Sequence, residues 1–135
     1  MPPCLFCEIA AGRIPAEVVH EAPGALAFLD VNPAARGHVL VVPRVHAATL
    51  PELDDAAVGD LFRAVKAVQE KVARTLRPLG MNVGWNHGRA AGQHVLHLHV
   101  HVLPRWADGG RGIQAMGTGG DRAELGAIAA ALRGA

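Results

Sequence analysis

HVLHLHVHVLPR, residues 94–105, alternates histidine with aliphatic side chains at almost every step. Such alternation predicts a half-buried strand, which we place at residues 95–103. Because successive side chains of a strand point to opposite faces, His97, His99 and His101 are expected to share one face. Leu96 and every second residue from there to Val102 fill the other face, which we expect to join the core.

The segments around this strand predict one long helix and four further strands. Apolar residues recur at helical spacing from Val58 to Leu76, with Asp54 before them as a candidate N-cap and Pro78 after them as a stop. Runs of β-branched and apolar residues between turn signals predict the strands. These strands are expected at residues 17–20, 25–29, 38–43 and 81–86, and short helices at residues 5–11 and 122–133.

Strands joined by short loops favour an antiparallel sheet. The predicted fold class is therefore α+β: an antiparallel five-stranded sheet with one long helix and short terminal helices. The 135 residues fit a single domain spanning 1–135. Its last part, 105–135, is expected to hold a glycine-rich loop at 108–120 and the final helix, with Asp121 as N-cap.

Charge and composition exclude several classes of protein. The net charge of +1 gives no general attraction to nucleic acid or to acidic membranes. No apolar run approaches the roughly 18 to 20 residues of a membrane span, and the N-terminus does not resemble a signal peptide. We therefore expect a cytoplasmic protein without nucleic-acid or membrane partners. In that compartment Cys4 and Cys7 are expected to be thiols or metal ligands rather than a disulfide.

The histidine face has three interpretations on the residues alone. A plain solvent-exposed face would normally mix Thr, Lys, Glu and Arg. A metal site is possible, although residues at i and i+2 of a flat strand usually supply two ligands of a tetrahedral ion rather than three. The third interpretation is a nucleophile with helpers, because an imidazole nitrogen attacks phosphorus and splits one displacement into two easier steps.

Five ordered blocks of this sequence resemble the histidine triad (HIT) family. Residues 92–105 resemble its signature, His-φ-His-φ-His-φ-φ, where φ is hydrophobic. The resemblance covers about residues 4–105 and extends to the Hint and fragile-histidine branches. The other blocks are CLFCEIAAGRIPAEVV at 4–19, FLDVNP at 28–33, GHVLVVPRVH at 37–46 and WNHGRAAGQ at 85–93.

This resemblance implies a HIT-like fold and a nucleotide site. His99 would attack the α-phosphorus of a nucleotide, and the nucleotidyl-histidine would then be hydrolysed to a nucleoside monophosphate. His101 and Gln93 would contact the phosphate oxygens, and His97 would complete the triad. The site residues implied for the nucleotide are Leu5, Phe6, Asp30, Val31, Asn86, Gln93, His94, His99 and His101.

Several of these residues have alternative roles. Asp30 would bind the ribose hydroxyls or merely cap the turn at residues 32–33. Asn86 would hold the phosphate or the strand edge, or else belong to a β-turn. Leu5, Phe6 and Val31 would enclose the base or simply be core.

His94 and His38 need separate treatment. His94 stands where the Hint and fragile-histidine branches have Ser or Thr near the leaving group. It would either donate a proton to that group or face solvent. His38 is expected to be a structural histidine with satisfied hydrogen bonds.

The resemblance also implies a metal site. The two cysteines alone are a weak signal. Bacterial members with this N-terminal pair bind zinc through it and through residues matching His46 and His97. The implied site is one structural Zn²⁺ per chain, held by Cys4, Cys7, His46 and His97.

The implied activity is hydrolysis of purine nucleotide phosphoramidates or dinucleoside polyphosphates. A nucleotidyl transferase or phosphorylase shares the first step. A non-catalytic, zinc-stabilised nucleotide-binding interaction protein is the alternative of another class. Members of the family are commonly homodimers built on the long helix and one strand. Val58, Val65 and Val72 would supply that contact or face the chain's own sheet.

Overall fold

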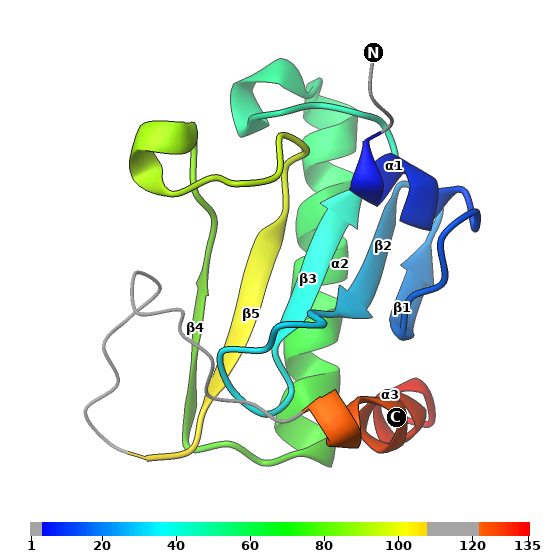
Figure 1. Cartoon of the computed structure of the whole chain (residues 1–135), viewed down its shortest axis with the longest axis vertical. Coiled ribbons are helices and arrows are strands. Elements are labelled where there is room, and N and C mark those ends of the chain that lie inside the picture. The colour runs from blue at the N-terminus through cyan, green and yellow to red at the C-terminus, as the bar shows by residue number, and fades with distance from the viewer. Residues whose placement is uncertain (1–3, 108–121) are drawn as a thin grey trace.

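The computed structural model describes residues 4–107 and 122–135, which form an antiparallel five-stranded sheet in the order β1-β2-β3-β5-β4 (Figure 1). The predicted α+β class is confirmed. Consecutive strands pair except where β5 enters between β3 and β4. The strands are β1 (Val18–Ala22), β2 (Ala25–Leu29), β3 (Val39–Pro43), β4 (Gly80–Gly84) and β5 (Val100–Arg105), and the α-helices are α1 (Leu5–Ala10), α2 (Asp55–Thr75) and α3 (Leu125–Arg133).

The long helix α2 covers one face of the sheet, and α1 lies against the opposite face near one end of β2 and β3 (Figure 1). Asp54 starts α2 by accepting a hydrogen bond from the Ala57 amide at 2.8 Å, as expected of an N-cap. Val65 and Val72 are buried in the cluster between α2 and the sheet, and Val58 packs against that cluster. These valines therefore face the chain's own sheet.

The two faces of β3 and β5 meet different surroundings. Val39 and Val41 point toward α2, as do Val100 and Val102. Leu40, which is paired with His101 in the ladder, points to the opposite face and joins a second cluster with Phe6. Alternation along two adjacent strands thus places an apolar core on one side and the histidine side on the other.

The histidine strand is shorter than predicted, and this is a correction. Regular strand begins at Val100 instead of residue 95, so His97 and His99 precede it. In this irregular stretch the Leu98 amide donates to the Ala47 carbonyl at 2.7 Å. Leu96 is 43% exposed and does not join the core, because the chain has not yet entered the sheet.

Other boundaries shift by a few residues. β4 ends at Gly84 instead of residue 86, and α1 ends at Ala10. The segment expected as the last helix opens with a 3₁₀ turn at Arg122–Glu124 before α3. The predicted loop at 108–120 and the N-cap Asp121 lie outside the described residues. Within the described ranges, no helix has both the length and the apolar character needed to cross a membrane.

Candidate active site

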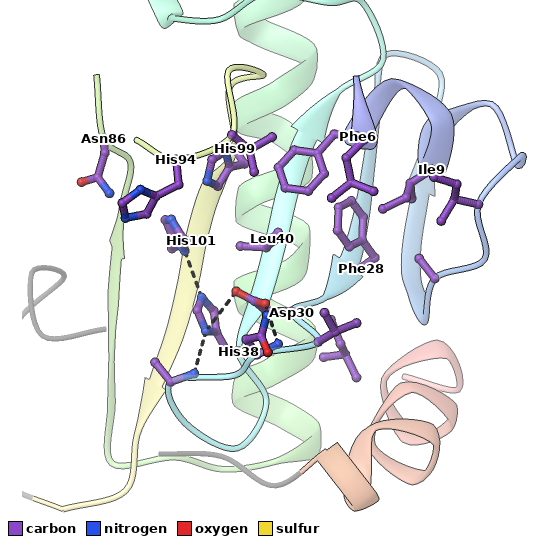
Figure 2. Close-up of a pocket in the computed structure, with 18 of the residues that line it drawn as sticks. Phe6, Ile9, Phe28, Asp30, His38, Leu40, Asn86, His94, His99 and His101 are labelled. Carbon is purple, nitrogen blue, oxygen red and sulfur yellow. Dashed lines mark hydrogen bonds and ion pairs between the residues drawn. The ribbon is translucent and has the colours of Figure 1, made fainter. Parts of the chain in front are cut away.

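A cavity of about 460 Å³ opens between α1 and the histidine side of the sheet (Figure 2). One end is apolar, with walls from α1, the segment after it, β2 and β3. The other end carries polar side chains from the loop after β2, from β5 and from the segments before it. The apolar end includes Leu5, Phe6, Ile9, Phe28 and Leu40, and the polar end includes Asp30, His38, Asn86, His94, His99 and His101.

His99 lies at the polar end with one ring nitrogen occupied. Its Nδ1 lies 2.8 Å from the carbonyl oxygen of His97. Because a carbonyl only accepts hydrogen bonds, Nδ1 must carry the proton, and Nε2 then keeps its lone pair. Burial lowers the pKa of His99, which favours this neutral form. The ring is therefore a neutral imidazole with one nucleophilic nitrogen.

A hydrogen-bond chain fixes the tautomer of His101 as well. The Ala34 amide donates to His38 Nδ1 at 3.0 Å, so His38 carries its proton on Nε2. His38 Nε2 then donates to His101 Nδ1 at 2.9 Å (Figure 2), which leaves the His101 proton on Nε2. Across residues 4–107 and 122–135, that Nε2 is the buried side-chain polar atom without a hydrogen-bond partner. It is a buried donor on a residue that lines the cavity, and buried donors normally have an acceptor.

His38 and His101, the two histidines of this hydrogen-bond chain, resist protonation. Burial lowers the pKa of His38 to about 4, and the charge of Arg105, together with the charge that His99 carries when protonated, acts in the same direction. Burial also lowers the pKa of His101 to about 3, with His38 and His99 adding to the effect. Near neutral pH the pair is uncharged, so His101 acts as a neutral hydrogen-bond donor.

Asp30 caps the turn after β2 and also lines the cavity. Its Oδ1 accepts from the Asn32 amide at 2.8 Å, which caps the turn, while the residue also lines the cavity. Burial raises the pKa of its carboxyl group. Asp30, His38 and His101 each place one possible ligand atom within 4.8 Å of the others. We assign no metal there, because both His38 nitrogens are already hydrogen-bonded.

The residues predicted to enclose a base differ in burial. Phe6 is 5% exposed and packs edge-on against Phe28 at 5.4 Å between ring centroids. It is therefore both a core residue and a wall of the cavity. Leu5 and Val31 line the cavity while 46% and 55% exposed, so they form its rim and are not core.

Gln93 supports a loop. Its Nε2 donates to the carbonyls of Ala48 at 2.7 Å and Val95 at 3.1 Å, and its Oε1 accepts from the Gly88 amide. Both amide protons are thus used, and Gln93 is absent from the cavity lining. The expected contact between its amide and a phosphate is not supported by this arrangement. Asn86 and His94 do line the cavity, and His94 is exposed there.

A second cluster joins the N-terminus to the segment before β5. His97 Nδ1 lies 3.3 Å from Cys4 Sγ and 3.4 Å from Cys7 Sγ, and His46 Nδ1 lies 3.3 Å from Cys7 Sγ. His97 Nε2 donates to the Pro43 carbonyl at 2.9 Å, so its Nδ1 lone pair faces the sulfurs. A tetrahedral zinc with Zn–S of about 2.3 Å and Zn–N of about 2.0 Å separates its ligand atoms by about 3.5 Å. The cluster fits zinc in ligand type and in spacing.

Sequence analysis missed the deep apolar wall and the support of the Asp30 loop. Ile9, Phe28 and Leu40 line the cavity. The sequence signal for this wall was the apolar character of residues 25–29 and 39–43 at consecutive positions, which indicates that both faces of these strands are covered. The loop after β2 is held from the C-terminal side of the chain. Trp106 Nε1 donates to the Arg36 carbonyl at 3.0 Å, and Arg122 donates to the Asn32 side chain.

Comparison with known proteins agrees with this geometry. The HIT domain model matches residues 11–108. "Protein hit" of Bacillus subtilis is 39% identical over 106 residues, which are 78% of this chain and 73% of that protein. The protein "Adenosine 5'-monophosphoramidase hnt1" of Schizosaccharomyces pombe is 42% identical over 102 residues, 76% of this chain and 74% of the relative.

A solved structure extends the likeness to almost the whole chain. The Zn-bound histidine triad family protein from Mycobacterium smegmatis superposes with a TM-score of 0.83 at 30% identity. The match covers 97% of this chain and 91% of that one. The chain belongs to the HIT domain family.

Proposed function

We propose that this chain is a nucleotide hydrolase in which His99 attacks the α-phosphorus of a nucleotide. The observation that carries the proposal is the state of His99: Nδ1 is tied to the His97 carbonyl at 2.8 Å, which leaves the Nε2 lone pair at the polar end of a cavity. A neutral imidazole with a free nitrogen is the form that acts as a nucleophile.

The reaction proceeds in two displacements. In the first, the bond from His99 Nε2 to phosphorus forms as the bond from phosphorus to the leaving group breaks, and the leaving group takes a proton from His94 or from solvent. In the second, water attacks phosphorus and gives up a proton to solvent as the nitrogen–phosphorus bond breaks, which releases a nucleoside monophosphate. His101 Nε2–H donates to a phosphate oxygen and stabilises the negative charge that develops on it.

The cavity favours a nucleoside phosphate as substrate. Its apolar end offers Phe6 and Leu5 to the faces of a base, and the carboxylate of Asp30 offers an acceptor to ribose hydroxyls. The S. pombe relative is named an adenosine 5'-monophosphoramidase, which supports purine nucleoside phosphoramidates as the substrate class. Hydrolysis of dinucleoside polyphosphates would begin with the same first displacement. So would nucleotidyl transfer, in which an acceptor other than water takes part in the second step.

We further propose that Cys4, Cys7, His46 and His97 hold one structural zinc. The likeness to a zinc-bound histidine triad protein supports this assignment, as does the spacing of the four ligand atoms, all within 4.8 Å of one another. When bound, zinc supplies a closed tetrahedral crosslink and no open position for chemistry.

A homodimer is the proposed assembly. β4 is an edge strand, and Val83 on it is 38% exposed. Among residues 4–107 and 122–135, no further strand pairs with β4, and such an edge is a template for pairing with a second chain. The opposite edge, β1, is in contrast bound by Arg133 from α3, which donates to the Val18 carbonyl at 2.7 Å.

Replacing His99 by Ala is expected to abolish release of AMP from an adenosine phosphoramidate. Removal of the nucleophile should lower kcat/KM by at least about 10³-fold, measured by chromatography of AMP. His87→Ala is the matched control, because His87 is exposed and does not line the cavity. Undiminished turnover in His99→Ala would remove the proposed mechanism.

Replacing His94 by Ala tests its role as a proton donor. Loss of a general acid should slow release of an amine by about 10²- to 10⁴-fold. It should also flatten the alkaline limb of the pH–rate profile, where a general acid has lost its proton. A substrate whose leaving group departs without a proton should react almost as fast as with the unmodified protein. The same pH–rate profile in both proteins would show instead that His94 only faces solvent.

The buried pair His38–His101 should make the fold sensitive to acid. Their folded-state pKa values, about 4 and about 3, lie below the ordinary 6.5. Below pH 6.5 the unfolded chain therefore binds more protons at these two residues than the folded chain does. This stability is complete above pH 6.5 and is lost as the pH falls from there toward 4, by up to about 1.4 kcal/mol per pH unit for each histidine. Apart from His101, a titratable group close to His38 is Asp30, whose Oδ2 lies 3.8 Å from His38 Nδ1. Arg105, and His99 when protonated, lower the pKa of His38.

The matching experiment is urea unfolding of His38→Gln between pH 7 and pH 4.5. A glutamine can accept from Ala34 and donate to His101 without titrating, so the slope of unfolding free energy against pH should decrease by up to about 1.4 kcal/mol per unit. His87→Gln should keep the original slope. An unchanged slope in His38→Gln would contradict the assigned protonation states.

The metal assignment predicts about one zinc per chain in the purified protein. Cys4→Ser should lose that zinc and unfold at a lower temperature, because a crosslink between the N-terminus and the sheet is gone. Elemental analysis and thermal unfolding provide the two measurements. Glu8→Gln is the control, since Glu8 lies beside Cys7 but pairs with Arg13. Metal-free protein with unchanged thermal stability would contradict the assignment.

A further inference from the structure

The metal cluster and the base end of the cavity share one short segment. Cys4 is the N-cap of α1, and its Sγ accepts a hydrogen bond from the Cys7 amide at 3.4 Å. The two residues between these cysteines are Leu5 and Phe6, and both line the cavity. Any ion held by both sulfurs therefore closes a loop whose inner side chains are walls of the nucleotide site.

The cluster and the nucleophile share one residue on the other side. The His97 ring presents Nδ1 to Cys4 and Cys7, and Pro43 holds its Nε2. The carbonyl of the same residue accepts from His99 Nδ1 at 2.8 Å. A shift of His97 would thus move both a metal ligand and the group that sets the His99 tautomer.

Phe6 connects these two sides. Its ring centroid lies 5.0 Å from that of His99 and 6.0 Å from that of His97, both edge-on. Phe6 is buried, and α1 has only six residues. A helix of that length is not stable by itself in water, so the position of Phe6 depends on tertiary contacts, and the cysteine cluster lies at the same end of α1.

We propose that Cys4, Cys7 and His46 are positioning residues for the nucleotide site, so that zinc binding and nucleotide binding each raise the affinity for the other. This inference rests on the proposed function, because it requires a nucleotide in the cavity. Zinc orders the segment that carries Leu5 and Phe6, and a bound base packs on the same side chains. Coupling is reciprocal, so the factor by which zinc tightens AMP equals the factor by which AMP tightens zinc.

The first measurement is AMP affinity by calorimetry with zinc-loaded protein and with protein stripped by a chelator. AMP is the product and is not turned over during the titration. We expect the loaded protein to bind AMP at least about 5-fold more tightly, the lower end of typical coupling. Val65→Ala is the matched control: it lowers stability from the α2 core and should leave the AMP affinity of loaded protein unchanged.

The second measurement starts from zinc-loaded protein and follows the removal of its zinc. Zinc affinity is determined by competition with a coloured chelator, with and without saturating AMP. The same fold increase in zinc affinity is expected. In Asp30→Ala the same AMP concentration should have a smaller effect, because the ribose contact is lost while the cluster is untouched; this also corrects for zinc binding to free AMP.

The outcomes separate the two proposals. If AMP does not bind loaded protein, both the proposed function and this inference fail. Equal AMP affinity with and without zinc, or zinc affinity that ignores AMP, overturns the coupling and leaves the proposed function standing. If stripped protein unfolds, zinc affinity responds to AMP through folding alone, because AMP binds only the folded chain; that outcome overturns the positioning role and leaves the proposed function standing.

Discussion

The hydrogen bond from His99 Nδ1 to the His97 carbonyl, 2.8 Å long, is the constraint on which the site depends. It decides which nitrogen is nucleophilic, and it requires a carbonyl that no neighbouring strand has taken. β5 is an inner strand with neighbours on both sides, where regular pairing uses the backbone groups for the ladder. The ladder therefore has to begin after residue 97, and the observed start at Val100 meets that requirement.

The regular elements of this fold follow from local sequence patterns. Strand alternation and the spacing of apolar residues in α2 are local patterns, so the five strands and the long helix could be predicted within a few residues. The early start predicted for the histidine strand was wrong because the alternation of residues 96–102 continues through its irregular part. Side-chain periodicity does not reveal whether a backbone carbonyl is used by a strand or by a side chain.

The candidate site was predictable to the extent that its residues are close in sequence. The alternating spacing of His97, His99 and His101 is visible in the sequence and predicts that they belong to one site. The partnership of His38 with His101 spans 63 positions and depends on β3 lying beside β5, so only the folded chain shows that His38 sets the tautomer of its partner. Gln93 is close to the triad in sequence, but its amide group does not reach the cavity. It donates both of its amide protons to backbone carbonyls, those of Ala48 and Val95.

Under the proposed assignments, one row of histidines serves two kinds of chemistry, because the residues before Val100 lie outside the regular strand. His97 directs its ring to the thiols, His99 to the cavity, and His101 to His38 within the sheet. In an extended strand all three rings would project from one face at similar depth, and a metal would compete for each of them. The irregular stretch before Val100 instead gives each ring its own partner, so the proposed zinc at His97 would leave the His99 nitrogen free for the proposed attack on phosphorus.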